Sequence, residues 1–111
     1  VAVLHLAGDL DLSNADQVDR AIREAEASDP DVLVLDLRSV TFLDSTILRG
    51  LVAAHSRARQ DGRRLAVAVG SEAVRRLFRI TLLEWRLEIV DDPAQVRPGR
   101  PPRTDRPGNR S

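Results

Sequence analysis

The sequence contains no cysteine and no lysine, and it is poor in histidine and in aromatic residues, with two Phe, one Trp and no Tyr. The lack of cysteine excludes disulfide scaffolds, thiolate zinc sites and cysteine nucleophiles. With only His5 and His55, a metal site built from several histidines is excluded too. No apolar run approaches the roughly 20 residues that a membrane span needs, and no signal peptide is visible. We therefore expect a cytoplasmic protein with no membrane partner.

Charge is distributed unevenly along the chain, although the 17 arginines balance the 17 acidic residues. Residues 1–96 hold 12 arginines against 16 acids, whereas residues 97–111 hold five arginines and one acid. An acidic body is not typical of a nucleic-acid-binding protein. Five of the six prolines follow residue 92. After Val96 there is no Ala, Val, Leu, Ile, Phe or Trp that could anchor a fold. This pattern predicts a domain over residues 1–92 and a disordered Pro/Arg-rich tail over residues 93–111.

Two kinds of segment alternate within residues 1–92. Short runs rich in Val and Leu predict strands buried on both faces of a sheet, over Val1–Leu6, Val32–Leu37, Leu65–Val69 and Leu87–Val90. Apolar positions spaced by three and four predict helices between them, over Asn14–Ala27, Thr46–Gln60 and Ser71–Ile80. Ser13 and Asp16 resemble a capping box for the first helix. The order predicts an α/β domain, with three helices and a mostly parallel central sheet of about four strands.

The sequence lacks the residues that nucleotide-binding enzymes and enzymes with a serine nucleophile usually need. The phosphate-binding loop G-x-x-x-x-G-K-[ST] is absent, and Gly8 is followed by acids that repel a pyrophosphate. Ser45 lies at a strand-to-helix turn, where hydrolases place a nucleophile, but the G-x-S-x-G motif is missing. His55 is roughly 15 Å further along the predicted helix and cannot serve as the base for that serine. We interpret His5 and His55 as partly buried packing residues.

Carboxylates offer a further set of candidates. The carboxyl ends of parallel strands gather at one edge, so Asp9, Asp11 and Asp44 are predicted neighbours, whereas Asp36 lies near the end of a predicted strand. Two such carboxylates suit Mg²⁺, and turn or cap duty is the alternative for each. Ser45 likewise has two interpretations, as the N-cap of the helix that follows or as an exposed functional hydroxyl.

Two stretches of the chain resemble the STAS domain, the fold of bacterial anti-sigma-factor antagonists. Residues Val3 to Ala15, VLHLAGDLDLSNA, are similar to the first long strand of that family and its G-[ED]-L-D turn. Residues Val32 to Leu48, VLVLDLRSVTFLDSTIL, are similar to its signature V-[LIV]-D-L-x-x-V-x-[FY]-[LMI]-D-S-[ST]-G-[LI]. The resemblance covers residues 1–92, and it implies a STAS-like fold with a further family strand expected to be missing upstream of Val1.

The resemblance implies a partner-switching regulator of transcription that is not an enzyme and needs no cofactor or metal. Such proteins bind an anti-sigma factor that is also a GHKL-type serine kinase, and so free the sigma factor. The kinase phosphorylates the D-S-[ST] segment, and a PP2C-type phosphatase reverses this. By position the phosphoacceptor is Ser45, with Thr46 as second choice. The implied partner-binding residues are Asp9, Asp11, Asp44, Thr46, Ile47, Arg49, Gly50, Ala53 and Arg57.

Ile47 departs from the family pattern, which has glycine at this position. We expect its β-branched side chain to narrow the approach to the start of the helix. This departure favours one alternative, a STAS accessory or sensor module, such as a transporter subunit, whose serine is not phosphorylated. The other alternative is a small Mg²⁺-dependent enzyme that uses Asp9, Asp11 and Asp44.

Overall fold

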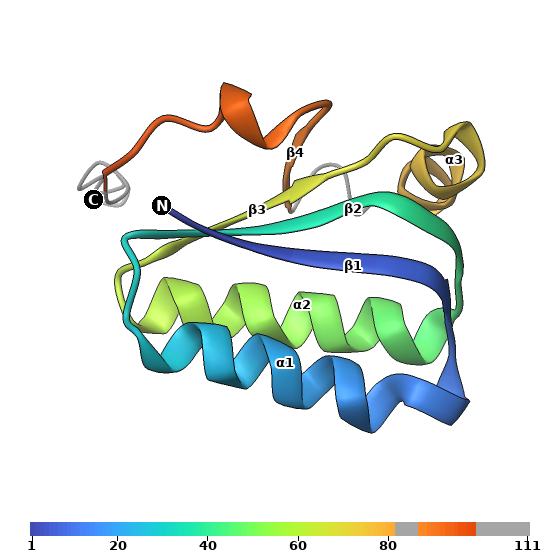
Figure 1. Cartoon of the computed structure of the whole chain (residues 1–111), viewed down its shortest axis with the longest axis horizontal. Coiled ribbons are helices and arrows are strands. Elements are labelled where there is room, and N and C mark those ends of the chain that lie inside the picture. The colour runs from blue at the N-terminus through green and yellow to red at the C-terminus, as the bar shows by residue number, and fades with distance from the viewer. Residues whose placement is uncertain (82–86, 100–111) are drawn as a thin grey trace.

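Three helices and a four-stranded parallel sheet make up the structure, a computed structural model that describes residues 1–81 and 87–99 (Figure 1). The predicted α/β fold class is thereby confirmed. The strands and helices alternate along the chain as β1 (Ala2–Leu10), α1 (Ala15–Ala27), β2 (Val32–Leu43), α2 (Ser45–Gln60), β3 (Arg64–Ala68), α3 (Glu72–Ile80) and β4 (Glu88–Val90).

The first two strands are longer than the apolar runs predicted. β1 continues to Leu10 and β2 to Leu43, because the residues beyond each run, polar ones included, still pair across the two strands. Asp9 pairs with Phe42 and Leu10 with Leu43. Asp9 is therefore a strand residue, and both strands end side by side immediately before Asp11 and Asp44.

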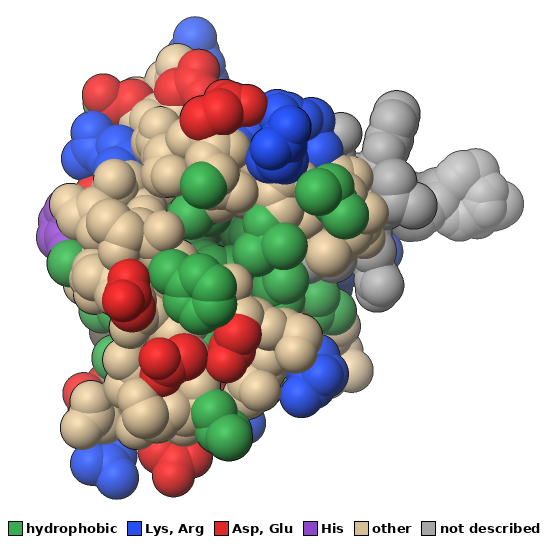
Figure 2. Space-filling view, turned by 90° about the vertical axis from the view of Figure 1, so that its right-hand side faces the viewer, with side chains coloured by type: hydrophobic (Ala, Val, Ile, Leu, Met, Phe, Trp, Pro, Cys, Tyr) green, Lys and Arg blue, Asp and Glu red, His purple; other side chains and the backbone are tan. Residues whose placement is uncertain are grey.

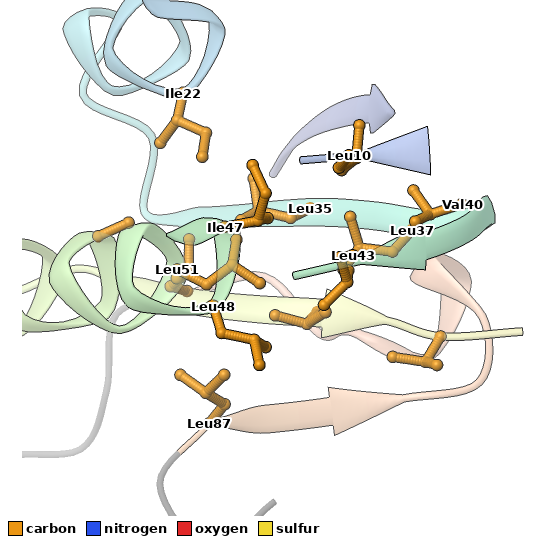
Figure 3. Packing of buried hydrophobic residues seen from close by; sticks show 14 of the residues in the cluster. Leu10, Ile22, Leu35, Leu37, Val40, Leu43, Ile47, Leu48, Leu51 and Leu87 are labelled. Carbon is orange, nitrogen blue, oxygen red and sulfur yellow. The ribbon is translucent and has the colours of Figure 1, made fainter. Parts of the chain in front are cut away.

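The helices cover one face of the sheet. α1 and α2 run side by side beneath it (Figure 1), and Val74 and Phe78 of α3 belong to the same apolar core. From β2, alternate residues point into this core, as Leu35 and Leu37 do (Figure 3). From α2, the core receives Ile47, Leu48, Leu51, Ala54 and Ala58, whose helical spacing agrees with the sequence prediction.

The opposite face is closed by a chain segment rather than by helices. Val32 and Val34 of β2 pack there with Ala66 and Ala68 of β3, and Val96 completes this second cluster. Two-sided burial, predicted from the continuous Val and Leu runs, is thus confirmed for β2 and β3. It is wrong for β1, an edge strand of the described sheet whose alternate residues are exposed.

The C-terminal segment stays packed beyond β4. Asp92 caps a short 3₁₀ turn over Pro93–Gln95, and Val96 is only 7% exposed. The Arg64 guanidinium donates to the carbonyl oxygen of Arg97 at 2.8 Å. The predicted tail over 93–111 therefore begins with residues that contact the sheet, and its remainder, residues 100–111, lies outside the described residues. No described helix is long and apolar enough to cross a membrane.

Candidate functional site

The start of α2 lies at one end of the molecule, beside the carboxyl ends of β1 and β2. The backbone N–H of Asp44 donates to the carbonyl oxygen of Leu10 at 3.2 Å, which joins the two strand ends. We call the region formed by residues 8–12 and 41–46 the α2 N-terminal end. It faces the viewer in Figure 2.

Asp44 fixes the geometry of this end through both carboxylate oxygens. Its Oδ1 accepts a hydrogen bond from the backbone N–H of Ile47 at 3.1 Å, and its Oδ2 accepts one from the backbone N–H of Leu12 at 3.1 Å. The first bond makes Asp44 the N-cap of α2, and the second ties the β1–α1 loop to the helix. Ser45 is therefore not the cap, and the interpretation of its hydroxyl as the N-cap of this helix is wrong.

Ser45 is the first residue of α2, and it is exposed. Within the described part of the chain, no group forms a hydrogen bond with the Ser45 hydroxyl. Thr46 is half-buried and lines a hollow of about 200 Å³ between α1 and α2, together with Asp16 and Gly50. Of the two hydroxyls, that of Ser45 is the more accessible to another protein.

Asp9 and Asp11 each have their own hydrogen-bond partners. Asp9 Oδ1 accepts from the Thr41 hydroxyl at 2.6 Å. Asp11 Oδ1 accepts from the backbone N–H of Ser13 at 2.9 Å and from its hydroxyl at 2.5 Å, and these bonds lower the pKa of Asp11. Asp11 also forms a capping box with Asn14 around the 3₁₀ turn Leu12–Asn14. The box predicted from Ser13 and Asp16 is wrong, because the N-cap of α1 is Asn14 and no described side chain caps this helix.

The three acids thus lie at the same end of the sheet, and each carboxylate accepts hydrogen bonds from its own donors. Asp9 is in β1, Asp11 follows that strand, and the Asp44 carboxylate accepts from the residue after Asp11. Within residues 1–81 and 87–99, no three His, Asp or Glu side chains are grouped so that they could hold a metal ion. Asp11 and Asp44 act as caps, whereas Asp9 is a strand residue that accepts a hydrogen bond from Thr41.

Ile47 does not narrow the approach to Ser45. It is 3% exposed, and Figure 3 shows its side chain pointing from α2 toward the sheet. The helix turns by about 100° per residue, so neighbouring positions on α2 face in very different directions. The expectation that Ile47 contacts a partner is wrong, because its side chain belongs to the core.

The remaining predicted contacts on α2 divide between two sides of the helix. Arg49 and Ala53 are exposed and line a shallow, largely apolar hollow of about 460 Å³ that also includes Ser45. Gly50 lies toward α1. Arg57 is half-buried and binds Glu26 of α1, with Nη2 to Oε2 at 3.0 Å. Arg57 therefore joins the two helices instead of offering a free cation to a partner.

Asp36 does not belong to this site. Buried on the face opposite the helices, it accepts from Arg38 Nε at 2.9 Å and Nη2 at 3.0 Å, and from His5 Nδ1 at 2.8 Å. The Arg38 bonds hold the pKa of Asp36 down at about 2, against the opposing effect of burial. The His5 side chain is 73% exposed, so the prediction that it is a partly buried packing residue is wrong.

Two exposed apolar residues at the α2 N-terminal end were absent from the predicted set. Leu12 is 73% exposed and Phe42 is 51% exposed. Phe42 follows a strand pattern whose buried neighbours, Val40 and Leu43, are three residues apart rather than two. In the sequence, Val40 and Phe42 stand two residues apart, which predicts a shared strand face. The register shift opposite Gly8 and Asp9, which the sequence does not signal, turns Phe42 outward instead.

The parallel four-stranded sheet with helices on one face, and a capped helix that begins at an exposed serine, define a STAS-type domain. The chain belongs to the STAS domain family, whose model matches residues 1–95.

Individual relatives agree with this membership. The anti-sigma-F factor antagonist RsfB of Mycobacterium tuberculosis is 41% identical over 71 residues, covering 64% of this chain and 58% of that protein. The chain thus matches little more than half the length of that relative. An anti-sigma-B factor antagonist of Listeria monocytogenes is 34% identical over 86 residues, covering 78% and 75%. The crystal structure of an anti-sigma factor antagonist from Mycobacterium paratuberculosis superposes with a TM-score of 0.77 at 27% identity, covering 84% and 79%.

Proposed function

We propose that this chain is an anti-sigma-factor antagonist, a cytoplasmic regulator of transcription rather than an enzyme. It binds an anti-sigma factor that is also a GHKL-type serine kinase, and phosphorylation of Ser45 by that kinase ends the binding. A PP2C-type phosphatase restores it. Support comes from the family and from the names of the relatives, which are antagonists of anti-sigma factors.

The main support for the proposed switch is that the Ser45 hydroxyl is exposed and is not used as a cap. It is exposed at the first position of α2, and Asp44 rather than Ser45 accepts the capping N–H of Ile47. In the transfer, a bond forms between Ser45 Oγ and the γ-phosphorus of ATP, the bond from that phosphorus to ADP breaks, and the hydroxyl proton is released. No capping bond is lost, and the helix N-terminus favours an added anion by about 0.3–1 kcal/mol. The modified domain should therefore stay folded.

The surrounding charge explains how the modification acts on binding. A phosphate adds about −1.5 to −2 units of charge. That charge arrives beside the Asp44 carboxylate, at the end of the sheet that also carries Asp9 and Asp11. Burying such a cluster against a partner is unfavourable by several kcal/mol unless cations meet it. About 1.4 kcal/mol changes affinity tenfold, so this unfavourable term is enough to weaken binding about a hundredfold without any change in the fold.

The exposed side of α2 extends the proposed contact surface. Arg49 and Ala53 share a hollow with Ser45, so a protein that reaches the serine also touches this side of the helix. Thr46 and Gly50 line the neighbouring hollow toward α1. Arg57 is engaged by Glu26, and we assign it to the support of α2.

A binding and modification experiment tests the proposal. A purified anti-sigma factor of the GHKL kinase type that binds the wild-type protein is incubated with it and with ATP, and the product is mapped by mass spectrometry. We expect phosphate on Ser45 alone, unimpaired binding with no switching for Ser45→Ala, and binding weakened at least about a hundredfold for Ser45→Asp. Ser56→Ala, which removes another exposed serine of α2, is the matched control and should behave as wild type. Phosphate at another residue, or tight binding by Ser45→Asp, would contradict the proposal.

The alternative of an unphosphorylated accessory or sensor module depended on Ile47 obstructing the serine. Since the Ile47 side chain is buried, that argument no longer favours it. Phosphorylation by a cognate kinase remains the experiment that separates the two roles.

A further inference from the structure

We infer that Phe42 and the hollow beside it form the apolar centre of the docking surface, which receives one apolar side chain of the anti-sigma factor. That side chain comes from a segment with basic residues facing Asp9 and Asp44. The inference rests on the proposed function and adds a specific anchor point to it.

Phe42 is the first observation. It is one of two phenylalanines in the chain, and the other, Phe78, is 1% exposed in the core. Phe42 instead leaves half of its surface in water, immediately before the buried Leu43. Exposed aromatic side chains are enriched at protein interfaces and at their energetic centres, where they are desolvated on binding.

A hollow next to Phe42 is the second observation. It has a volume of about 220 Å³ and lies between the end of β2 and α3, lined by Thr41, Phe42, Leu43, Ala73, Val74 and Leu77. Small-molecule sites usually measure about 300–1,000 Å³. This hollow is below that range and is lined almost entirely by apolar side chains, which suits a single apolar side chain from another protein.

The charge around the hollow is the third observation and selects the occupant. Figure 2 shows hydrophobic side chains gathered in the middle of this end of the molecule, with several acidic side chains beside them. Asp9 accepts from Thr41, a residue of the hollow's wall, and Asp44 lies two residues after Phe42. On the α3 side, Arg75 binds Asp91 and Arg79 binds Glu72. The strand side of the hollow therefore presents acids to an incoming segment, and basic side chains complement them.

The position of this anchor also links it to the switch. Ser45 follows Phe42 by three residues, so their Cα atoms are at most about 11 Å apart. Ser45 lines the separate hollow that Arg49 and Ala53 also line, so a partner that covers both hollows must desolvate a phosphate on Ser45. Modification of the serine thus acts on the anchor without any movement of the fold.

Two substitutions test the anchor against the anti-sigma factor that wild-type protein binds. Phe42→Ala removes the aromatic wall, and Ala73→Leu fills the hollow while adding apolar surface. We expect each to raise the dissociation constant at least about tenfold. Val3→Ala changes an exposed valine of β1 and should stay within about twofold of wild type. Circular dichroism and thermal melting verify that all three variants are folded.

The outcomes distinguish a failure of this inference from a failure of the proposed function. Unchanged affinity for Ala73→Leu means that no side chain enters the hollow, and overturns the inference while leaving the proposed function intact. A wild-type dimer in sedimentation velocity that Phe42→Ala converts to monomers overturns it too, since the occupant is then a second copy. Wild-type protein that binds no anti-sigma factor overturns the proposed function itself.

Discussion

Replacing Ile47 with alanine separates the role of this residue in the core from any role at the surface. The Ile47 side chain is 3% exposed and belongs to the cluster that contains Leu35 and Leu51. Truncation of a buried Ile to Ala removes its transfer free energy and leaves a cavity, at a cost of about 2–5 kcal/mol. Alanine is an excellent helix former, so the α2 backbone gains slightly rather than loses. We expect the free energy of unfolding to fall by about 2–4 kcal/mol, which a typical domain stability of about 5–15 kcal/mol tolerates.

Two measurements check this expectation. Urea denaturation followed by far-UV circular dichroism gives the change in the free energy of unfolding. Ile80→Ala is the matched control, because Ile80 is 69% exposed at the end of α3 and its loss should cost less than about 0.5 kcal/mol. The initial rate of Ser45 phosphorylation under native conditions gives the second readout, and we expect Ile47→Ala to leave it within about twofold.

The result that refutes the reasoning is specific. If Ile47→Ala destabilises the domain by less than about 1 kcal/mol and raises the phosphorylation rate at least about tenfold, Ile47 obstructs the serine after all. Ile47→Val, with an expected cost of about 0.5–1.5 kcal/mol, gives an intermediate point that keeps the test informative if the alanine variant unfolds.

Three further predictions concern polar contacts, one at the α2 N-terminal end, one between α1 and α2, and one on the opposite face of the sheet. Asp44→Ala removes the acceptor of two backbone N–H groups, so urea denaturation should show a loss of about 1–2 kcal/mol. Asp36→Asn should destabilise the domain by about 2 kcal/mol at neutral pH, because the folded pKa of about 2 lies below the ordinary value of 3.8. That difference should be present above about pH 4 and disappear as the pH falls toward 2, which unfolding curves at several pH values will show. For Arg57 and Glu26, a double-mutant cycle with Arg57→Gln and Glu26→Gln should give a coupling of about 0.5–1 kcal/mol that shrinks in 1 M salt.

The residues at the α2 N-terminal end have different roles. Asp44 and Asp11 use their carboxylates to hold backbone N–H groups, which keeps the end rigid. Ser45 does not cap the helix, and the proposed function makes it the phosphoacceptor. Phe42 supplies apolar contact area close to it. Under the proposed function, phosphorylation of Ser45 adds its charge to this rigid, acidic end of the domain.

Much of the fold was determined by the sequence itself, because secondary structure depends on patterns within about a dozen residues. Continuous Val and Leu runs marked β2 and β3, and apolar spacings of three and four marked all three helices. The proposed phosphoacceptor, Ser45, and the acidic residues around it were also identified from the sequence, through the motif that resembles the STAS signature.

Tertiary structure alone decided which face of each element is buried and which polar group completes each cap. Ile47 and Arg57 were predicted at the surface, but one packs under the sheet and the other binds Glu26 of α1. Leu12 donates its N–H to Asp44, 32 residues away, so the capping pattern at this end is non-local. Phe42 is exposed because strand register, not composition, sets its direction. The periodicity of a segment shows that the segment has an apolar face. It does not show what that face packs against, because the packing of distant segments contributes more free energy than local preferences do.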